Sequence, residues 1–240
     1  VNAGLVGETK ETGNVGFDAA FLDQRLPFSA EYYNSKTNDV LAETPIAIST
    51  GNQGGSPWKN AASLRNKGFE FTLGWKDQVS DFKYSALLNV TTIDNEVLSL
   101  GRDGSRRDYI DSGQARTRPG HSLAEFYLRQ TDGLFRTQQE IDEYVTKGTH
   151  VPEGTENKVE AGTPILINGK RPQLGDVKYL DLNDDGQITA KDRDYCGSPW
   201  AKMQMSLVFN AEWKAIDFSM TWNGQFGNKV LNVARWQARM

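Results

Sequence analysis

One short stretch near the C-terminal end of the chain concentrates side chains that could bind a metal ion. Asp181, Asn183 and Asp185 stand at alternate positions, Gly186 and Gln187 follow, and Asp192 ends the stretch. In a calcium loop, positions 1, 3, 5 and 12 supply side-chain oxygens, position 6 is a glycine and position 7 supplies its backbone carbonyl. The sequence therefore predicts a Ca²⁺ site with these ligands: Asp181, Asn183, Asp185, Gln187 (through its carbonyl) and Asp192.

This stretch differs from an EF-hand in two respects. Position 12 is Asp192 rather than glutamate, which shortens the bidentate arm, and no helix is expected on either side of the loop. Residues 177–180 have the composition of a strand, and residues 197–199 read Gly-Ser-Pro. The ion would therefore have a structural role. The alternative is a turn closed by its own Asx side chains.

The remaining residues give little indication of a catalytic site. The two histidines, His121 and His150, lie in expected loops without a partner motif, and the single cysteine, Cys196, is expected to be a small apolar residue of the interior. We therefore expect that the chain is not an enzyme. Aromatic rings in loops can stack on sugar rings, and three such residues are candidates for substrate contacts: Trp58, Tyr109 and Trp200.

Composition narrows the class of protein further. The net charge of −4 gives no reason to expect nucleic acid as a partner. With 38% hydrophobic residues and 23 glycines among 240 residues, the chain can form a turn-rich β protein. No apolar run is long enough for a transmembrane helix, but the alternating strands of a membrane barrel are polar on average and would escape that search.

Alternation of apolar and polar residues predicts three β-hairpins, at about residues 14–33, 68–92 and 202–223. In the third, one face carries Met203, Met205, Leu207, Phe209 and Trp213, and the other carries Gln204, Ser206, Asn210 and Glu212. Each hairpin has a short turn with aromatic residues beside it. The links between hairpins are long, at residues 34–66 and 101–200, and in the second the Thr137-x-x-Glu140 capping box predicts one short helix.

This layout favours an all-β fold, an antiparallel up-and-down transmembrane β-barrel segment with long extracellular loops and one short helix. Strands of this length cross a bilayer obliquely, and short turns on one side with long loops on the other are typical of outer-membrane barrels. The aromatic residues near the turns would form an interfacial girdle. A soluble β-sandwich has the same alternation and remains the alternative.

Several motifs together resemble the SusC/RagA-type TonB-linked outer-membrane transporters of the Bacteroidetes. They are Asn66-Lys67-Gly68-Phe69-Glu70-Phe71, residues 31–39 (EYYNSKTND), Thr131-Asp132-Gly133-Leu134-Phe135, and Gly175-Asp176-Val177-Lys178-Tyr179 with the acidic loop after it. Their order and approximate spacing agree with the family over nearly the whole chain. The chain resembles an internal segment from the second half of the barrel, with about six or seven strands, too few to close it.

The resemblance implies a bacterial outer-membrane protein that imports oligosaccharides or peptides with energy from TonB. It also implies a surface lipoprotein of the SusD type as partner and an N-terminal plug domain, which this segment lacks and through which TonB would act. The expected function is therefore that of barrel wall and outer loops in an active nutrient importer, in contact with outer-membrane lipid. The competing hypothesis is a soluble extracellular β module for binding or adhesion, stabilised by calcium.

Overall fold

The computed structural model describes residues 5–43, 58–100, 108–149, 151 and 158–232. They form two compact units. Unit 1 comprises Val1–Glu125 and Gly197–Met240, and unit 2 comprises Phe126–Cys196. Among the described residues, no helix has the length and apolar character needed to cross a membrane.

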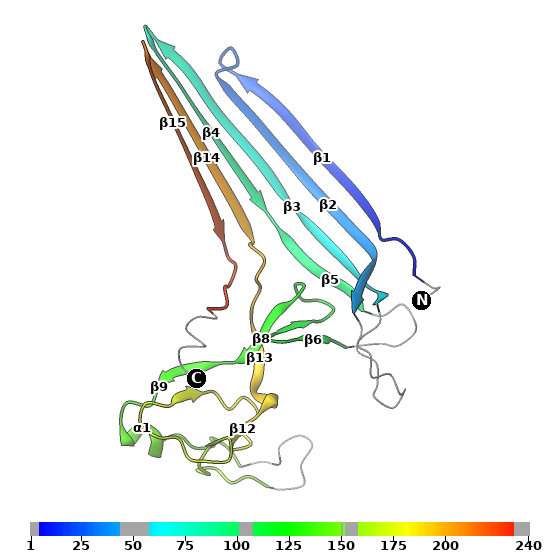
Figure 1. Cartoon of the computed structure of the whole chain (residues 1–240), viewed down its shortest axis with the longest axis vertical. Helices are drawn as coiled ribbons and strands as arrows, with labels where there is room; N and C mark the ends of the chain where they lie inside the picture. Colours follow the sequence, from blue (N-terminus) through cyan, green and yellow to red (C-terminus); the bar gives the residue numbers. More distant parts are fainter. Residues whose placement is uncertain (1–4, 44–57, 101–107, 150, 152–157, 233–240) are drawn as a thin grey trace. The chain divides into compact units, whose positions relative to one another are not determined.

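Unit 1 is built on one antiparallel sheet whose long strands pair in the order β1-β2-β3-β4-β14-β15 (Figure 1). The strands are β1 (Thr9–Phe21), β2 (Leu26–Glu43), β3 (Trp58–Val79), β4 (Phe82–Thr92), β14 (Met203–Trp213) and β15 (Ile216–Phe226). Strand β4 pairs directly with β14, although the whole segment between Thr92 and Met203 separates them in sequence. That segment first pairs with β3 through residues 94–100, then leaves the sheet, and returns to it as β14, beside β4.

Short turns join the strands of each hairpin at the same end of the sheet, at the top of Figure 1. They lie at Leu22–Arg25, Ser80–Asp81 and Lys214–Ala215. The register Phe82↔Trp213↔Ile216 places the last two turns side by side. Backbone φ angles are positive at Ser80 (55°) and Lys214 (53°), because two-residue hairpin turns need left-handed residues to match the twist of the strands.

The expected loop at residues 34–66 is wrong in its extent. Strand β2 continues to Glu43 and β3 already begins at Trp58, so only residues 44–57, which lie outside the described part of the chain, can hold a loop. Apolar and polar residues do not alternate in these extensions: Val40 and Leu41 are adjacent apolar residues, and Ser35 and Asn60 are buried polar ones. Cross-strand pairing defines the strands there, as in Lys36↔Arg65 and Leu41↔Asn60.

The expected loop at residues 101–200 also contains regular structure. In unit 1 it begins after β5 (Asp94–Leu100), which pairs with the first half of β3, and includes the hairpin of β6 (Ile110–Ser112) and β7 (Ala115–Thr117). The other elements are β8 (Glu125–Arg129), β9 (Thr131–Leu134), α1 (Gln138–Asp142), β10 (Leu166–Ile167), β11 (Val177–Tyr179), β12 (Gln187–Ile188), η2 (Ala190–Asp192) and β13 (Arg193–Gly197). The Thr131-Asp132-Gly133-Leu134 part of the third motif forms strand β9, which pairs with β11.

Unit 2 has a small core of its own, formed by Phe135, Ile141, Tyr144, Ile165 and Ile188, none of them more than 7% exposed. The predicted helix supplies Ile141, and its N-cap is Thr137, whose hydroxyl accepts from the Glu140 amide at 3.2 Å. The core lies between α1 and the acidic loop, so unit 2 is organised around the stretch that the sequence marks as a metal site.

Candidate functional site: a two-faced sheet and an acidic loop

One face of the main sheet is a continuous apolar surface. Residues that pair across antiparallel strands share a face. The row Leu73, Leu88, Leu207 and Trp222 is apolar, and so is the row Phe71, Val90 and Met205. The side chains of this face are exposed. Trp222 is 56% exposed, and Phe17 of β1, which lies in the row of Phe71, is 61% exposed. The buried apolar residues described in unit 1 are only Val97, Leu100 and Ala201, so no second layer within the described residues covers this face.

The opposite face of the same sheet is polar. Its rows include Thr72, Asn89, Ser206 and Asn223, and next to it Glu70, Thr91, Gln204 and Gln225. An exposed apolar face of this size on a soluble protein would be an aggregation hazard. The combination of one exposed apolar face and one polar face fits a wall between lipid and water.

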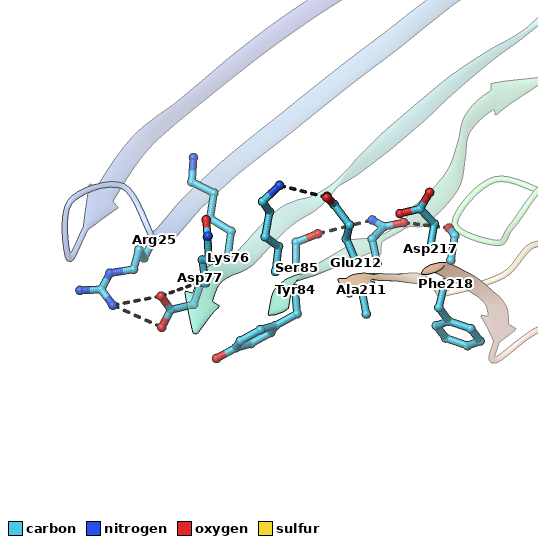
Figure 2. A pocket seen from close by; sticks show the side chains of 13 residues that line it. Arg25, Lys76, Asp77, Tyr84, Ser85, Ala211, Glu212, Asp217 and Phe218 are labelled. Atoms are coloured by element: carbon cyan, nitrogen blue, oxygen red, sulfur yellow. Dashed lines mark hydrogen bonds and ion pairs between the residues drawn. The ribbon is translucent and has the colours of Figure 1, made fainter. Parts of the chain in front are cut away.

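A cavity of about 700 Å³ lies on the sheet near its short-turn end (Figure 2). Figure 2 shows Lys76, Glu212 and Asp217 pointing to one side of the sheet, whereas the rings of Tyr84 and Phe218 point to the other. The lining of the cavity therefore combines charged side chains of the polar face with residues of the apolar face, Tyr84 and Phe218 among them.

Charges around this cavity are partly paired. Arg25 and Asp77 form an ion pair at 3.2 Å, and Lys83 and Glu212 form one at 3.0 Å. Within the described part of the chain, Lys76 and Asp217 are in no ion pair. Sequence reasoning missed this group, because only the strand register brings residues so distant in sequence into one row.

The acidic loop of unit 2 is closed by hydrogen bonds from its own backbone. The Asp181 carboxylate accepts from the amides of Asp185 (3.2 Å) and Gly186 (2.8 Å), and Asp185 Oδ1 accepts from the Gln187 amide (2.8 Å). Asn183 Nδ2 donates to Asp185 Oδ2 at 2.9 Å. Gly186 has a φ of 77°, which explains the glycine at the sharpest point of the loop. The structure thus gathers three of the predicted ligands, Asp181, Asn183 and Asp185, in one turn.

Asp192 is fully buried and both of its oxygens are engaged. Oδ1 accepts from the Leu182 amide at 3.1 Å, and Oδ2 accepts from the Thr189 amide at 2.6 Å. It therefore ties the two ends of the loop together. Among the described residues, no three His, Cys, Asp or Glu side chains converge in a group ready to hold a metal ion.

Negative charge is nevertheless crowded in this loop. Burial raises the pKa of Asp181, its acceptance from the Gly186 amide opposes that rise, and the carboxylates of Asp192 and Asp185 add to it. Burial also raises the pKa of Tyr144, whose hydroxyl donates to the Tyr179 carbonyl at 2.5 Å just before the loop. A cation would relieve this repulsion.

The loop is firmly attached to the rest of unit 2. Ile188 is 3% exposed in the core, and the Leu166 amide donates to the Gly186 carbonyl at 2.8 Å. Arg129 Nε donates to the Thr189 carbonyl at 2.9 Å. A further carboxylate outside the predicted ligand set, that of Asp184, accepts from the Lys147 and Gly148 amides.

The three aromatic candidates lie in different settings in unit 1. Trp58 begins β3 and is 53% exposed. Tyr109 is 47% exposed and lies under the Arg116 guanidinium, 3.7 Å from its ring centre. Trp200 is 48% exposed and lines a cavity of about 220 Å³ whose lining includes neither of the others. These three side chains therefore do not form one shared aromatic surface.

Of the two histidines, His121 has a partner that sequence reasoning missed. Its Nδ1 lies 3.0 Å from Glu125 Oε2, a spacing of four residues that could have been noticed in the sequence. His150 lies outside the described residues.

Comparison with known proteins agrees with this architecture. The profile of the family described as TonB dependent receptor-like, beta-barrel matches residues 2–239. TonB-dependent receptor P26 of Formosa agariphila is 29% identical over 241 residues, which cover 97% of this chain and 22% of that protein. TonB-dependent receptor P3 of the same organism is 29% identical over 239 residues, with 96% and 22% covered. The chain thus spans about a fifth of the length of the curated relatives it matches.

Solved structures show the same fold. The RagAB peptide transporter matches with a TM-score of 0.64 and 18% identity, over 92% of this chain and 21% of that one. The 'open-open' state of the RagAB peptide importer matches with a TM-score of 0.65 and 19% identity, over 93% and 21%. The expected antiparallel barrel fold is confirmed, and the soluble adhesion module loses its basis because the matched family resides in the outer membrane. The chain belongs to the β-barrel family of TonB-dependent receptors, proteins of the bacterial outer membrane.

Proposed function

We propose that this chain forms barrel wall and outer loops of an outer-membrane importer that TonB energises. The observation that carries the proposal is the main sheet, whose apolar face is exposed and whose other face is polar. In this assignment Met205, Leu207 and Trp222 contact lipid, while Ser206 and Asn210 line the lumen. The short turns then face the periplasm and unit 2 belongs to the outer loops.

The imported substrate is proposed to be an oligosaccharide or a peptide. A surface lipoprotein of the SusD type would assist capture, and TonB would act through an N-terminal plug domain. Family membership supports transport in general, and the RagAB structures, which are of a peptide importer, support this class of assembly. Trp200, which lines a small cavity with Asn95 and Ser122, is the best placed of the three aromatic candidates to contact substrate, ahead of Trp58 and Tyr109.

Uptake by intact cells tests this function. A strain lacking the receptor gene is complemented with the wild-type gene, and uptake of labelled oligosaccharides and labelled peptides is compared in the presence and absence of a proton uncoupler. We expect one substrate class to enter only with the gene and only without the uncoupler. Uptake that persists with the uncoupler, or no gene-dependent uptake of either class, would contradict the proposal.

A Ca²⁺ ion in the acidic loop is the second part of the proposal. Asp181, Asn183 and Asp185 are gathered in one turn, and each carboxylate oxygen keeps a lone pair beyond its amide contact. The carbonyl of Gln187 would complete the inner ligands. Asp192 is already bonded to two amides, so it would bind the ion only by sharing an oxygen. When bound, the ion supplies positive charge that holds the loop closed, and a Kd on the order of 10⁻⁴ M is sufficient outside the cell.

Hydrogen exchange in the intact receptor tests the calcium site. After chelator treatment, we expect added Ca²⁺ to slow exchange at the Gly186 and Gln187 amides in the wild type and in the control Asp194→Ala, which lies outside the loop. Asp185→Ala should lose the response to Ca²⁺ while the barrel strands keep their protection. If Ca²⁺ leaves wild-type exchange unchanged, the loop is a turn closed by its own side chains and the calcium proposal fails.

A further inference from the structure

The Asn66-Lys67-Gly68 motif of β3 lies where the sheet meets the segment that leaves it. Asn66 pairs with Asn95 of β5, and Lys67 pairs with Asp94. Asn95 Nδ2 donates to Asn66 Oδ1 at 2.7 Å, and Lys67 Nζ lies 3.3 Å from Asp94 Oδ2. The motif therefore fixes the start of β5 against the wall.

Asn95 also holds the chain that comes after β5. Its Oδ1 accepts from the Leu123 amide at 2.8 Å, and its backbone carbonyl accepts from the Ser122 hydroxyl at 3.1 Å. An asparagine amide carries both a donor and an acceptor, so one side chain can bind the wall through Nδ2 and the outgoing chain through Oδ1. Asn66 on one side and Leu123 on the other are thus linked through a single side chain.

Two stretches of chain, which we call the outgoing leg (residues 118–123) and the returning leg (residues 198–202), meet at this point. In the outgoing leg, the His121 carbonyl accepts from the Val97 amide and the Gly120 amide donates to the Val97 carbonyl, each at 2.9 Å. In the returning leg, the Lys202 carbonyl accepts from the Ile93 amide at 2.9 Å. Trp200 Nε1 then donates to the Leu123 carbonyl at 2.9 Å and joins the two legs.

At the joint between the legs and β5, the apolar side chains of Val97 (0% exposed) and Ala201 (8% exposed) are buried, and Ala201 lies beside an open space. A cavity of about 220 Å³ lies there, and its lining includes Asn95, Ser122, Ser198 and Trp200. Where apolar packing is incomplete, individual hydrogen bonds decide whether the segments stay together. Hydrogen bonds therefore contribute to holding both legs at the wall. The returning leg has two more, from the Lys202 amide to the Phe226 carbonyl (2.9 Å) and from the Lys229 amide to the Ser198 carbonyl (2.8 Å).

We propose that Asn95, held by Asn66, is a positioning residue that fastens the outgoing leg to the barrel wall, and that the Trp200–Leu123 contact couples this leg to the returning one. The inference goes beyond the proposed transport function, because it holds whatever the substrate is. It also gives the Asn-Lys-Gly motif a physical role: Asn66 orients the amide of Asn95, and Asn95 orients the outgoing leg.

Residue-resolved hydrogen exchange on the intact receptor in detergent tests the joint. Asn95→Ala removes the acceptor of the Leu123 amide, and we expect exchange there to become about tenfold faster, with smaller increases in both legs. Asn66→Asp keeps an acceptor for Asn95 Nδ2 and should stay close to wild type. Asn89→Ala is the matched control, since the Asn89 side chain accepts from the Thr72 hydroxyl within the wall at 2.9 Å, and should leave both legs unchanged.

A second variant separates the two legs. Trp200→Phe keeps the ring and removes the Nε1 donor, and we expect it to speed exchange in the outgoing leg although the substitution lies in the returning one. Unchanged exchange at Leu123 in Asn95→Ala, or equal acceleration in Asn89→Ala, would overturn the proposal. A Trp200→Phe receptor whose outgoing leg keeps wild-type exchange would overturn the link between the legs. None of these outcomes depends on uptake, so they are independent of the test of transport.

Discussion

Gly68 occupies the tightest backbone approach in the wall, and replacing it with alanine should weaken the sheet there. A Cβ at this position would overlap the backbone carbonyl of Thr92 and come within 2.9 Å of the Tyr33 hydroxyl. The obstacle is backbone rather than the end of a flexible side chain, so the strands must separate. Two hydrogen bonds are at risk: Tyr33 Oη to the Thr92 carbonyl at 3.1 Å, and the Phe69 amide to Thr92 Oγ1 at 2.8 Å.

The expected cost follows from these contacts. Forcing one extra carbon into a packed contact costs about 1–3 kcal/mol, and each weakened hydrogen bond adds about 0.5–1.5 kcal/mol. We expect Gly68→Ala to lower the free energy of unfolding by about 2–6 kcal/mol. Gly13→Ala, in β1 of the same sheet, has nothing within 4 Å of the added carbon. It should be neutral or stabilising by up to about 1 kcal/mol, because alanine loses less backbone entropy than glycine.

Reversible denaturant unfolding of the intact receptor in detergent measures both variants. Hydrogen exchange at the Phe69 amide reports whether the damage is local. Equal stability of the Gly68→Ala and Gly13→Ala receptors would refute the reasoning, because it would mean that the close approach to Thr92 does not exist in the folded wall.

Three further changes test other parts of the account. Leu207→Arg on the apolar face should destabilise the barrel by about 2–4 kcal/mol, whereas Ser206→Arg on the polar face should cost much less, as measured by denaturant unfolding in vesicles. Ile188→Ala should loosen the core of unit 2, where we expect about 2–4 kcal/mol less protection of its amides from exchange and no change in the wall. Lys83→Ala should change barrel stability by less than about 1 kcal/mol, because both members of its ion pair with Glu212 are about half exposed; a larger loss in the unfolding midpoint would contradict this.

Sequence periodicity predicted the central part of the wall well. The alternation around Met203–Trp213 is a direct consequence of the two faces of a strand, and the structure has β14 at those residues. The same signal failed at residues 34–43 and 58–66, because adjacent apolar residues such as Val40 and Leu41, and buried polar residues such as Asn60, break the alternation there. The pairing of β4 with β14 could not be predicted from periodicity, since it depends on the return of a long excursion to its starting point.

The structure of the acidic loop was likewise predictable from the sequence only in part. Spacing identified Asp181, Asn183, Asp185 and Gly186 as one turn, because such a turn is a local structure. The Asp192 carboxylate accepts from the Thr189 amide as part of a Thr189-x-x-Asp192 capping box, a local pattern that the calcium-loop interpretation overlooked. Its second contact, with the Leu182 amide, depends on the closure of the whole loop. The cavity at the short-turn end could not be predicted from the sequence, since its residues come from separate strands.

The most direct test of the central claim is the accessibility of successive residues along β14. Spin labels placed one at a time at residues 203–213 of the intact receptor in lipid vesicles can be probed with oxygen, which concentrates in lipid, and with a water-soluble nickel complex. We predict a period of two, with high oxygen accessibility at Met205, Leu207 and Phe209 and low values at Ser206 and Asn210. An absent alternation, or one of the opposite phase, would contradict the assignment of this chain to the membrane wall.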